Sequence, residues 1–471
     1  MEMHYQKLFE KGYIGGVEIR NRVAMTAMGN GLASWDGEAS PELIRFYEDR
    51  ARGGCGLIFT EFTRVDETSG ACNPNQLCIA TRKHVRSVQR MAERVHRHGA
   101  RIFVQLHHGG REAPPALNDG KQPMGPSAIL NKVNGLVSTE MTKEEIGFII
   151  KKFVAAAVNC QKAGIDGVEL HAAHGYLLGS FISPYTNKRT DEYGGSVQNC
   201  CRIVTEIING IRAACGRYPI CVRINGSDFV EGGITLAYAV EVAKTLEAAG
   251  ADALNVSCAV YETVPNMIEP NYYEEGWRKE LAKTVKAHVK IPVIAVNTIK
   301  FPATAEKLLE EGVSDFVGVS RGQMADPEWV NKARAGREDL IRKCMGCMQC
   351  NKSVVQDGYL SCAANPVTGR GTMYNDEYLI RSGAGRNVVV IGGGPAGMQA
   401  AITLAKRAFH VILLEQKSYL GGMAYLATVP PHKTMVAEFI KTLEAEMKEL
   451  GVDVRMNVTA DVATVKALEP Y

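Results

Sequence analysis

The chain has 471 residues, 46% apolar and 22% charged, which suits two or three domains with a large buried core. Its net charge is only +3 and no Lys/Arg stripe is present, which argues against a nucleic-acid partner. The first residues, MEMHYQKLFEKGYIGG, lack an apolar signal-peptide core, and no run approaches the roughly 18 apolar residues of a membrane span. We therefore expect a cytoplasmic protein with no membrane partner.

Short β-rich runs alternate with longer helical patterns through the first part of the chain. This alternation is typical of parallel strands joined by right-handed helical crossovers. Eight such units favour an α/β fold with a closed (β/α)8 TIM barrel over residues 1–335, and an open doubly wound sheet is the alternative. The predicted strands are Val23–Thr26, Leu57–Glu61, Ile102–Leu106, Gly167–His171, Ile220–Ile224, Ala253–Ser257, Pro292–Asn297 and Phe316–Ser320. The predicted helices between them include Glu42–Arg52, Arg86–His98, Lys143–Ala163, Cys201–Cys215 and Tyr238–Ala249.

The carboxyl ends of barrel strands carry the chemistry in this architecture. Here those ends are polar: Thr26–Met28, Glu61, Gln105, His171, Arg223, Ser257, Asn297 and Arg321. The segment after the fourth strand is the richest in such side chains. Its two histidines, His171 and His174, with Tyr176 two residues further on, could bind an anionic oxygen and deliver a proton. Simple capping of the loop by His174 and Tyr176 fits the spacing equally well.

Thirteen cysteines, an odd number, do not suit a disulfide framework. Nine are scattered, as expected of free buried thiols in a reducing compartment. The other four lie in residues 336–385 with the spacing C-x2-C-x2-C-x11-C: Cys344, Cys347, Cys350 and Cys362. Four thiolates in one loop can bind zinc or a cubane cluster, and three cysteines at two-residue gaps favour a [4Fe–4S] cluster over zinc.

A new pattern begins in residues 386–471, in the order strand, glycine-rich turn, helix and strand. Gly392, Gly394 and Gly397 form G-x-G-x-x-G, and Glu415 follows about 20 residues on, where an acid binds the ribose of a dinucleotide. The alternative is a glycine-rich turn that binds nothing. The elements predicted around the turn are Val388–Ile391, Ala396–Arg407 and Val411–Leu414.

Only one further helix, Met435–Leu450, and one further strand, Val452–Met456, are evident after this unit. A complete two-nucleotide module has more strands than these. We therefore expect a partial, Rossmann-like FAD/NAD(P)-binding domain that is truncated at its carboxyl end.

The motifs taken together resemble the Old Yellow Enzyme family. The resemblance rests on LFEKGYIGGVEIRNRVAM, VQLHHGGR, the His171–Ser196 segment, the cysteine loop and the GGGPAG turn, which occur in this order along nearly the whole chain. The family's larger members join an FMN barrel to an iron–sulfur loop and a flavin/NADH domain. They include 2-enoate reductases, 2,4-dienoyl-CoA reductases and trimethylamine-type dehydrogenases.

The resemblance implies four cofactors: FMN, a [4Fe–4S] cluster, FAD, and NADH or NADPH as electron donor. It places Thr26 and Met28 against the flavin N5/O4 edge, Gln105 at the pyrimidine edge and Arg223 beside N1 and O2. The phosphate site would follow the last two strands, at Asn297, Thr298, Ser320 and Arg321.

The resemblance also implies an activity. Reduced FMN would give a hydride to the activated C=C of an enoate, enone or enoyl thioester, while His171 and His174 bind the carbonyl oxygen and Tyr176 protonates the α-carbon. The partner is then a small unsaturated carbonyl or carboxylate compound. A homo-oligomer is compatible with the sequence. Electrons would arrive from NADH or NADPH through FAD and the cluster.

Two other functions remain open. One is an amine dehydrogenase of the trimethylamine dehydrogenase type, although Trp277 and Trp329 more readily fit packing roles than an aromatic box for a cation. The other is a truncated electron-transfer flavoprotein with little catalysis of its own. Two departures from the family pattern bear on the substrate: Gly29 stands where many members carry Thr, Cys or His, and Tyr261 falls where dienoyl-CoA reductases have an acidic histidine.

Overall fold

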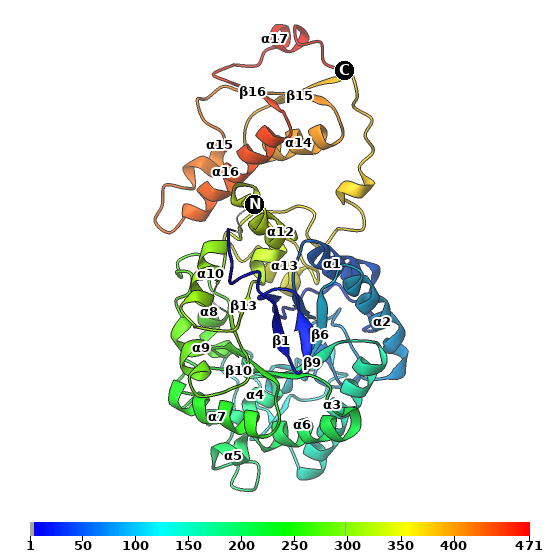
Figure 1. The fold of residues 1–471 in the computed structure, drawn as a ribbon, viewed down its shortest axis with the longest axis vertical. Helices are drawn as coiled ribbons and strands as arrows, with labels where there is room; N and C mark the ends of the chain where they lie inside the picture. The colour runs from blue at the N-terminus through cyan, green and yellow to red at the C-terminus, as the bar shows by residue number, and fades with distance from the viewer. Residues whose placement is uncertain (1–3, 297) are drawn as a thin grey trace.

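The computed structural model describes residues 4–296 and 298–471. Eight strands close into a barrel, with the connecting helices as an outer ring (Figure 1). Each strand pairs in parallel with its neighbours, and closure comes from the pairings β13–β3, β3–β4 and β4–β6. The predicted barrel is thus confirmed, and the open-sheet alternative is wrong.

The barrel strands are β3 (Val23–Met25), β4 (Leu57–Phe59), β6 (Arg101–His107), β9 (Gly167–Ala172), β10 (Ile220–Asn225), β11 (Ala253–Ser257), β12 (Val293–Val296) and β13 (Phe316–Gly318). The outer helices are α1 (Pro41–Arg52), α2 (Arg82–His96), α3 (Lys143–Lys162), α6 (Arg202–Cys215), α7 (Leu236–Ala248), α9 (Lys279–Lys286), α10 (Pro302–Glu310), α11 (Arg321–Ala325) and α12 (Trp329–Arg334). Shorter elements lie in the loops: β5 (Thr63–Arg64), β7 (Met124–Gly125), β8 (Thr139–Glu140), α4 (Leu177–Ile182), α5 (Val197–Cys200) and α8 (Val264–Met267).

Helix α3 illustrates how local sequence sets the ring of helices. Thr142 accepts a hydrogen bond from the Glu145 N–H, and the Glu145 side chain accepts one in return from the Thr142 N–H. This reciprocal cap starts the helix. Apolar side chains then recur every three or four residues and are buried against the barrel: Ile146, Ile149, Phe153, Ala157 and Cys160.

A two-stranded hairpin closes the amino-terminal end of the barrel. Strands β1 (Gly12–Ile14) and β2 (Val17–Ile19) pair antiparallel around Gly15 and Gly16, whose φ angles of 55° and 83° suit a two-residue turn. Ile14 and Ile19 are buried in a cluster with residues near the starts of barrel strands, including Leu57, Ala253 and Phe316. The opposite, carboxyl-terminal end of the barrel is therefore the end that can admit a ligand.

The carboxyl-terminal unit is a three-stranded parallel sheet covered by helices. Its elements are β14 (Asn387–Ile391), α14 (Pro395–Lys406), β15 (His410–Glu415), α15 (Gly422–Leu426), α16 (Thr434–Glu449), β16 (Asp453–Met456) and α17 (Val462–Lys466). Helices α14 and α16 pack on the sheet through a separate apolar core that includes Met398, Ile402, Leu413, Ile440 and Leu443.

Helix α16 also contacts the segment that leads from the barrel to the cysteines. The Arg342 guanidinium donates from Nε to Glu446 Oε1 (2.6 Å) and from Nη2 to Glu446 Oε2 (2.7 Å). The Thr442 hydroxyl donates to the Ile341 carbonyl at 3.2 Å. The carboxyl-terminal unit is thus held near the barrel by a buried ion pair rather than by the linker alone (Figure 1).

Within the described part of the chain, no helix has the length and apolar character required to cross a bilayer.

Candidate active site

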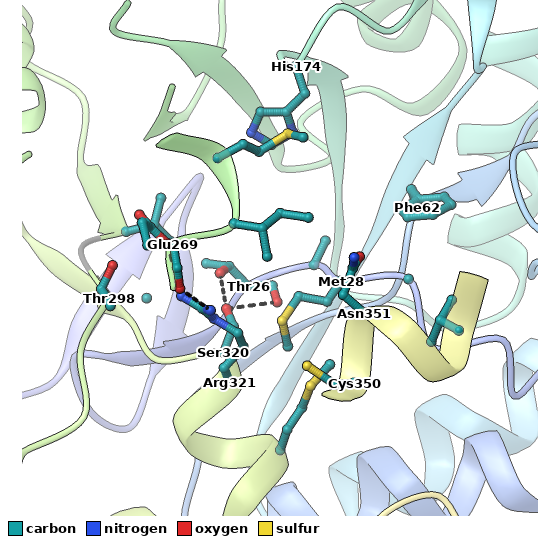
Figure 2. A pocket seen from close by; sticks show the side chains of 18 of the residues that line it. Thr26, Met28, Phe62, His174, Glu269, Thr298, Ser320, Arg321, Cys350 and Asn351 are labelled. Carbon is teal, nitrogen blue, oxygen red and sulfur yellow. Dashed lines mark hydrogen bonds and ion pairs between the residues drawn. The ribbon is translucent and has the colours of Figure 1, made fainter. Parts of the chain in front are cut away.

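A cavity of about 240 Å³ opens at the carboxyl ends of the barrel strands (Figure 2). It brings together most of the residues that the sequence singled out. The predicted residues that line it are Thr26, Met28, Gln105, His171, His174, Tyr176, Arg223, Thr298, Ser320, Arg321, Cys344 and Cys350. Asn297 was predicted beside Thr298 and lies outside the described residues.

Glu61 does not line this cavity, contrary to its expected place in the polar ring. Its carboxylate is fully buried and accepts hydrogen bonds from the N–H groups of Asn30 and Leu77, each at 3.0 Å. Burial raises the pKa of this carboxyl to about 7. The strand ends earlier than predicted, at Phe59, so Glu61 turns away and fastens two loops to the barrel rim.

Three buried polar atoms on the cavity wall have no hydrogen-bond partner among the described residues. They are Gln105 Oε1, Arg223 Nε and Thr298 Oγ1. Buried polar groups in native proteins are nearly always paired, so these atoms indicate a polar ligand. An acceptor, a cationic donor and a hydroxyl suit the pyrimidine edge, the N1/O2 edge and the phosphate of FMN, respectively.

Gln105 is oriented by a carboxylate beneath it. Its Nε2 donates to Glu169 Oε2 at 2.6 Å, and Asn255 Nδ2 donates to Glu169 Oε1 at 2.8 Å. Burial raises the pKa of Glu169, whereas the Arg223 charge lowers it. With its amide nitrogen engaged, Gln105 presents its oxygen as an acceptor.

Close packing explains why position 29 carries a glycine. A Cβ there would stand 2.6 Å from the Phe62 ring and 2.9 Å from Asn73 Nδ2. Gly29 therefore leaves room for the Phe62 ring, which also lines the cavity. Phe62 is a cavity residue that sequence reasoning missed.

Residues after the last strands form a charged wall. Arg321 donates to the Glu269 carbonyl at 2.6 Å and pairs with its carboxylate at 2.9 Å, while Arg278 pairs with the other Glu269 oxygen at 2.9 Å (Figure 2). The Ser320 hydroxyl donates to the Thr26 carbonyl at 3.2 Å. Ser320 and Arg321 reach the cavity as expected, and Arg278 and Glu269 join them from the loop after β11.

His171 and His174, which line the cavity, form a chain of three histidines with His107. His107 Nδ1 lies 3.1 Å from His171 Nδ1, and His171 Nε2 lies 3.1 Å from His174 Nδ1. His174 Nε2 lies 2.7 Å from the Ser257 hydroxyl, and the His174 backbone has a φ of 62°. His107 was not predicted as a site residue. The alternation of side chains along a strand could have indicated it, because His107 lies two residues after Gln105 and so points to the same face.

All three imidazoles are neutral at pH 7. Burial lowers the pKa of His107, His171 and His174 well below the ordinary value, and the Arg223 charge lowers the pKa of the last two further. Each neutral ring carries one N–H and one acceptor nitrogen. The hydrogen bonds along the three rings can therefore run in either of two directions. In one, every donating N–H points towards Ser257; in the other, every donating N–H points towards His107.

Tyr176 is only 4% exposed and hydrogen-bonds Tyr261, with the two hydroxyl oxygens 2.6 Å apart. Burial, followed by the charge of Tyr261, raises the pKa of Tyr176 well above its ordinary value. The tyrosine is therefore protonated at neutral pH. Tyr261, noted in the sequence only as a departure from the dienoyl-CoA reductase pattern, is part of the site.

The four cysteines of the loop surround one small cavity: Cys344, Cys347, Cys350 and Cys362. Three of these thiols stand at two-residue gaps with a more distant fourth, a spacing that favours a cubane cluster over a single zinc ion. The Gly346 N–H also donates to Cys344 Sγ at 3.5 Å, as backbone amides do around iron–sulfur clusters. The donor set fits a [4Fe–4S] cluster better than zinc.

The cysteine loop and the barrel cavity share a wall. Cys344 and Cys350 line both cavities, as do Arg321 and Gly346. Figure 2 shows Cys350 and Asn351 facing Met28 and Ser320. A cluster held by these thiols would thus lie directly beside the ligand in the barrel.

The glycine turn of the carboxyl-terminal unit lies as predicted between β14 and α14. A Cβ on Gly397 would stand 2.0 Å from the Gly392 carbonyl oxygen, and Gly392 has a φ of 96°. Gly394 caps the helix, whose first N–H groups are available to a phosphate. Glu415 ends β15 and accepts from the Gly393 N–H at 2.7 Å, which places its carboxylate beside the turn.

Comparison with family models agrees with this arrangement. The model of the NADH:flavin oxidoreductase / NADH oxidase family matches residues 7–340. That of FAD dependent oxidoreductases matches residues 387–465.

Individual relatives match along nearly the whole chain. An NADH oxidase from Thermoanaerobacter brockii is 47% identical over 470 residues, 99% of this chain and 72% of that protein. A cinnamate reductase from Clostridium sporogenes is 34% identical over 99% of this chain and 73% of that protein. An N,N-dimethylglycine/sarcosine dehydrogenase from Chromohalobacter salexigens is also 34% identical, over 99% of this chain and 68% of that protein. The solved structure of a 2-naphthoyl-CoA reductase superposes with a TM-score of 0.94 at 29% identity, covering 99% of this chain and 73% of that one.

Proposed function

Because the chain belongs to the NADH:flavin oxidoreductase / NADH oxidase family, we propose that it is a flavin- and iron–sulfur-dependent ene-reductase. It would take electrons from NADH or NADPH and reduce a C=C bond conjugated to a carbonyl or carboxylate group. The observation that carries this proposal is the pairing, in one cavity, of a neutral histidine chain with a buried, protonated tyrosine.

The barrel binds FMN and the carboxyl-terminal unit binds FAD. When bound, FMN supplies the two electrons that reduce the alkene. We assign its pyrimidine edge to Gln105, its N1/O2 edge to Arg223 and its phosphate to the wall of Thr298, Ser320 and Arg321. The positive charge of Arg223 stabilises a reduced, anionic flavin.

His171 and His174 orient the substrate in this proposal. The N–H that one ring directs at the other can turn to a carbonyl or carboxylate oxygen that enters between them. Since both rings are neutral, they polarise the oxygen without giving up a proton. Tyr176 holds the proton that goes to the α-carbon, and its burial keeps that proton from exchanging freely with water.

Amine oxidation is the second candidate, because one relative is a dimethylglycine/sarcosine dehydrogenase. The charge of the cavity disfavours it. Three guanidinium groups line the cavity, Arg223, Arg278 and Arg321, and only the last two pair with the Glu269 carboxylate. Such a wall attracts an anion or a carbonyl dipole and repels a cationic amine. Trp277 packs against Phe229 and Tyr273 and does not form a box at the cavity wall.

An anaerobic titration tests the proposal. The chain is loaded with its cofactors, its FMN, FAD and iron are quantified, and it is reduced with dithionite. Cinnamate or a cyclic enone is then added while flavin absorbance is followed. We expect the alkene to reoxidise the flavin, and we expect Tyr176→Phe to slow reoxidation by about a hundredfold or more, the usual contribution of a general acid.

Trimethylamine, added to the oxidised enzyme, serves as the opposing substrate. Flavin reduction by the amine without reoxidation by any alkene would replace the ene-reductase proposal with amine oxidation. Retained FMN and iron with neither reaction would indicate an electron-transfer role. Ser87→Ala, in α2 on the outside of the barrel, controls for loss of a hydroxyl elsewhere.

A further inference from the structure

A buried ionic cluster of Arg111, Glu112 and Glu262 lies next to the tyrosine pair. Arg111 is 1% exposed, and its Nη2 donates to Glu262 Oε1 at 2.6 Å. Its Nε lies 3.6 Å from Glu112 Oε1. One guanidinium thus faces two carboxyl groups away from solvent. Because an uncompensated buried charge is costly, the cluster is favoured when one carboxyl carries a proton.

Glu112 is the carboxyl that carries it. Glu262 is the carboxyl that receives the short hydrogen bond from Arg111. Glu112 is held instead by Asn131, whose Nδ2 donates to its Oε2 at 2.9 Å. Burial, with a smaller contribution from the charge of Glu262, raises the pKa of Glu112 to about 7 against the opposing effects of Arg111 and Asn131.

Backbone connections place this cluster against the acid of the active site. Glu262 directly follows Tyr261 in a single 3-10 turn, Tyr261–Thr263. Glu112 Oε1 lies 3.8 Å from the position of a Cβ on Gly175, the residue before Tyr176. The charge of Glu112 raises the pKa of both Tyr176 and Tyr261, so it acts on both hydroxyls.

The cluster also has unused hydrogen-bonding capacity. Four of its buried atoms have no partner among the described residues: Arg111 Nε, Arg111 Nη1, Glu112 Oε1 and Glu262 Oε2. A buried polar site with two to four available partners is where proteins hold an ordered water. A water held there by Arg111, Glu112 and Glu262 would adjoin Tyr261, the residue before Glu262.

Tyr176 needs a source of protons. Tyr176 loses its proton to the substrate in each turnover of the proposed reaction, and only 4% of its surface reaches solvent. Its hydroxyl is hydrogen-bonded to Tyr261, the residue directly before Glu262 of the cluster. The tyrosinate must therefore be reprotonated from within the protein.

We propose that Glu112 is the internal proton donor that restores Tyr176, with Tyr261 as the relay. The Tyr261 O–H bond breaks as its proton forms the new O–H bond of Tyr176. The Glu112 carboxyl then reprotonates Tyr261 through the water held in the cluster, and solvent reprotonates Glu112. No electrons move in these steps, and one proton enters for each proton delivered to the substrate. This inference rests on the proposed ene-reductase function.

Several titratable and charged groups face Glu112 from the elements around it. Arg111 comes from its own turn, and helix α4 and strand β7, which pack on that turn, present no ionisable side chain. The remaining groups come from other loops: Glu262, Tyr261, Tyr176, Tyr185 and Cys72. Of these, Glu262 is the one whose negative charge opposes ionisation of Glu112.

A comparison of first and later turnovers tests the route, with dithionite as reductant so that the carboxyl-terminal unit is not needed. In Glu112→Gln the first reoxidation of reduced flavin by cinnamate should keep its wild-type rate, since Tyr176 begins protonated. The steady-state rate should fall by about tenfold or more, as expected when an internal proton-transfer group is lost. Tyr261→Phe should slow the later turnovers as well, and Glu112→Asp should recover part of the rate.

The pH profile gives a second readout. The wild-type steady-state rate should decline above about pH 7 as Glu112 ionises, and Glu112→Gln should lack this decline. The exposed Glu231→Gln is the matched control and should behave as wild type. Equal first-turnover and steady-state rates in both Glu112→Gln and Tyr261→Phe would overturn the relay. A wild-type enzyme that alkenes never reoxidise would instead reject the proposed function.

Discussion

His107 shows how much of the site depends on contacts between distant residues. It lies 64 positions before His171, yet its Nδ1 is one of the two hydrogen-bond partners that fix the His171 ring. The sequence predicted His171, His174 and Tyr176, because they share one short motif. It did not predict that His107 and Tyr261 complete the group, since those contacts arise only when barrel strands become neighbours.

We expect His107→Gln to impair orientation rather than cofactor binding. With its Nδ1 partner removed, His171 can take other rotamers, and the rate of alkene-dependent flavin reoxidation should fall by about tenfold, which corresponds to about 1.4 kcal/mol. FMN content should stay at the wild-type level. Loss of FMN from this variant would show that His107 acts through the fold instead.

The buried histidines also make stability depend on pH. Their pKa values lie well below the unfolded value of about 6.5, so below that pH the unfolded chain binds more protons than the folded one. Stability is then fully present above pH 6.5 and declines as the pH falls. The melting temperature should drop between pH 6.5 and 5, and His107→Gln should show a shallower drop. Equal slopes would indicate that His107 is charged in the folded protein.

At the scale of elements, periodicity located the barrel strands and the outer helices well. The strands at β4 and β13 end two residues earlier than predicted, because polar residues at strand ends leave the sheet to build loops. The hairpin β1–β2 was not predicted. The cysteine motif was evident, but its place as a wall of the barrel cavity was not, because only the folded chain brings Cys350 to Met28.

The glycine turn before α14 gives a prediction for FAD. Gly397→Ala would place a Cβ 2.0 Å from the Gly392 carbonyl oxygen, so the turn must open and the phosphate-binding N–H groups must move. We expect FAD content to fall sharply and FMN content to stay constant, as measured by chromatography of the released flavins. Gly147→Ala, in α3 with open space around it, is the matched control. FAD retention at the wild-type level in Gly397→Ala would contradict this placement.

At the scale of the whole molecule, the two family matches leave the segment between residues 340 and 387 unassigned. That segment carries the cysteine loop, and the domain boundaries drawn through it from sequence remain predictions. Arg342, at its start, forms the buried ion pair with Glu446 on α16. This contact between the barrel and the carboxyl-terminal unit could not be predicted from the sequence, because Arg342 and Glu446 are 104 residues apart.

We expect Arg342→Met to separate the two halves of the electron route. Removing one partner leaves Glu446 without its counter-charge, at a cost of about 3 kcal/mol to docking of the carboxyl-terminal unit. NADH-driven alkene reduction should therefore fall, while dithionite-driven reduction is retained. The double variant with Glu446→Leu should recover part of the NADH-driven rate. An equal loss of both activities would mean that Arg342 supports the barrel itself.

The wall that the cysteine loop contributes to the barrel cavity has a consequence for assembly of the holoprotein. Residues from Cys344 to Leu360 enclose the side of the cavity that the barrel strands leave open. Before the cysteine loop is in place, the FMN cavity of a newly made barrel lacks one wall. FMN should therefore bind firmly only after the cysteine thiols have bound iron and sulfide. Oxygen damage to the cluster should accordingly release flavin as well as iron, so that maturation and decay of the two prosthetic groups proceed together.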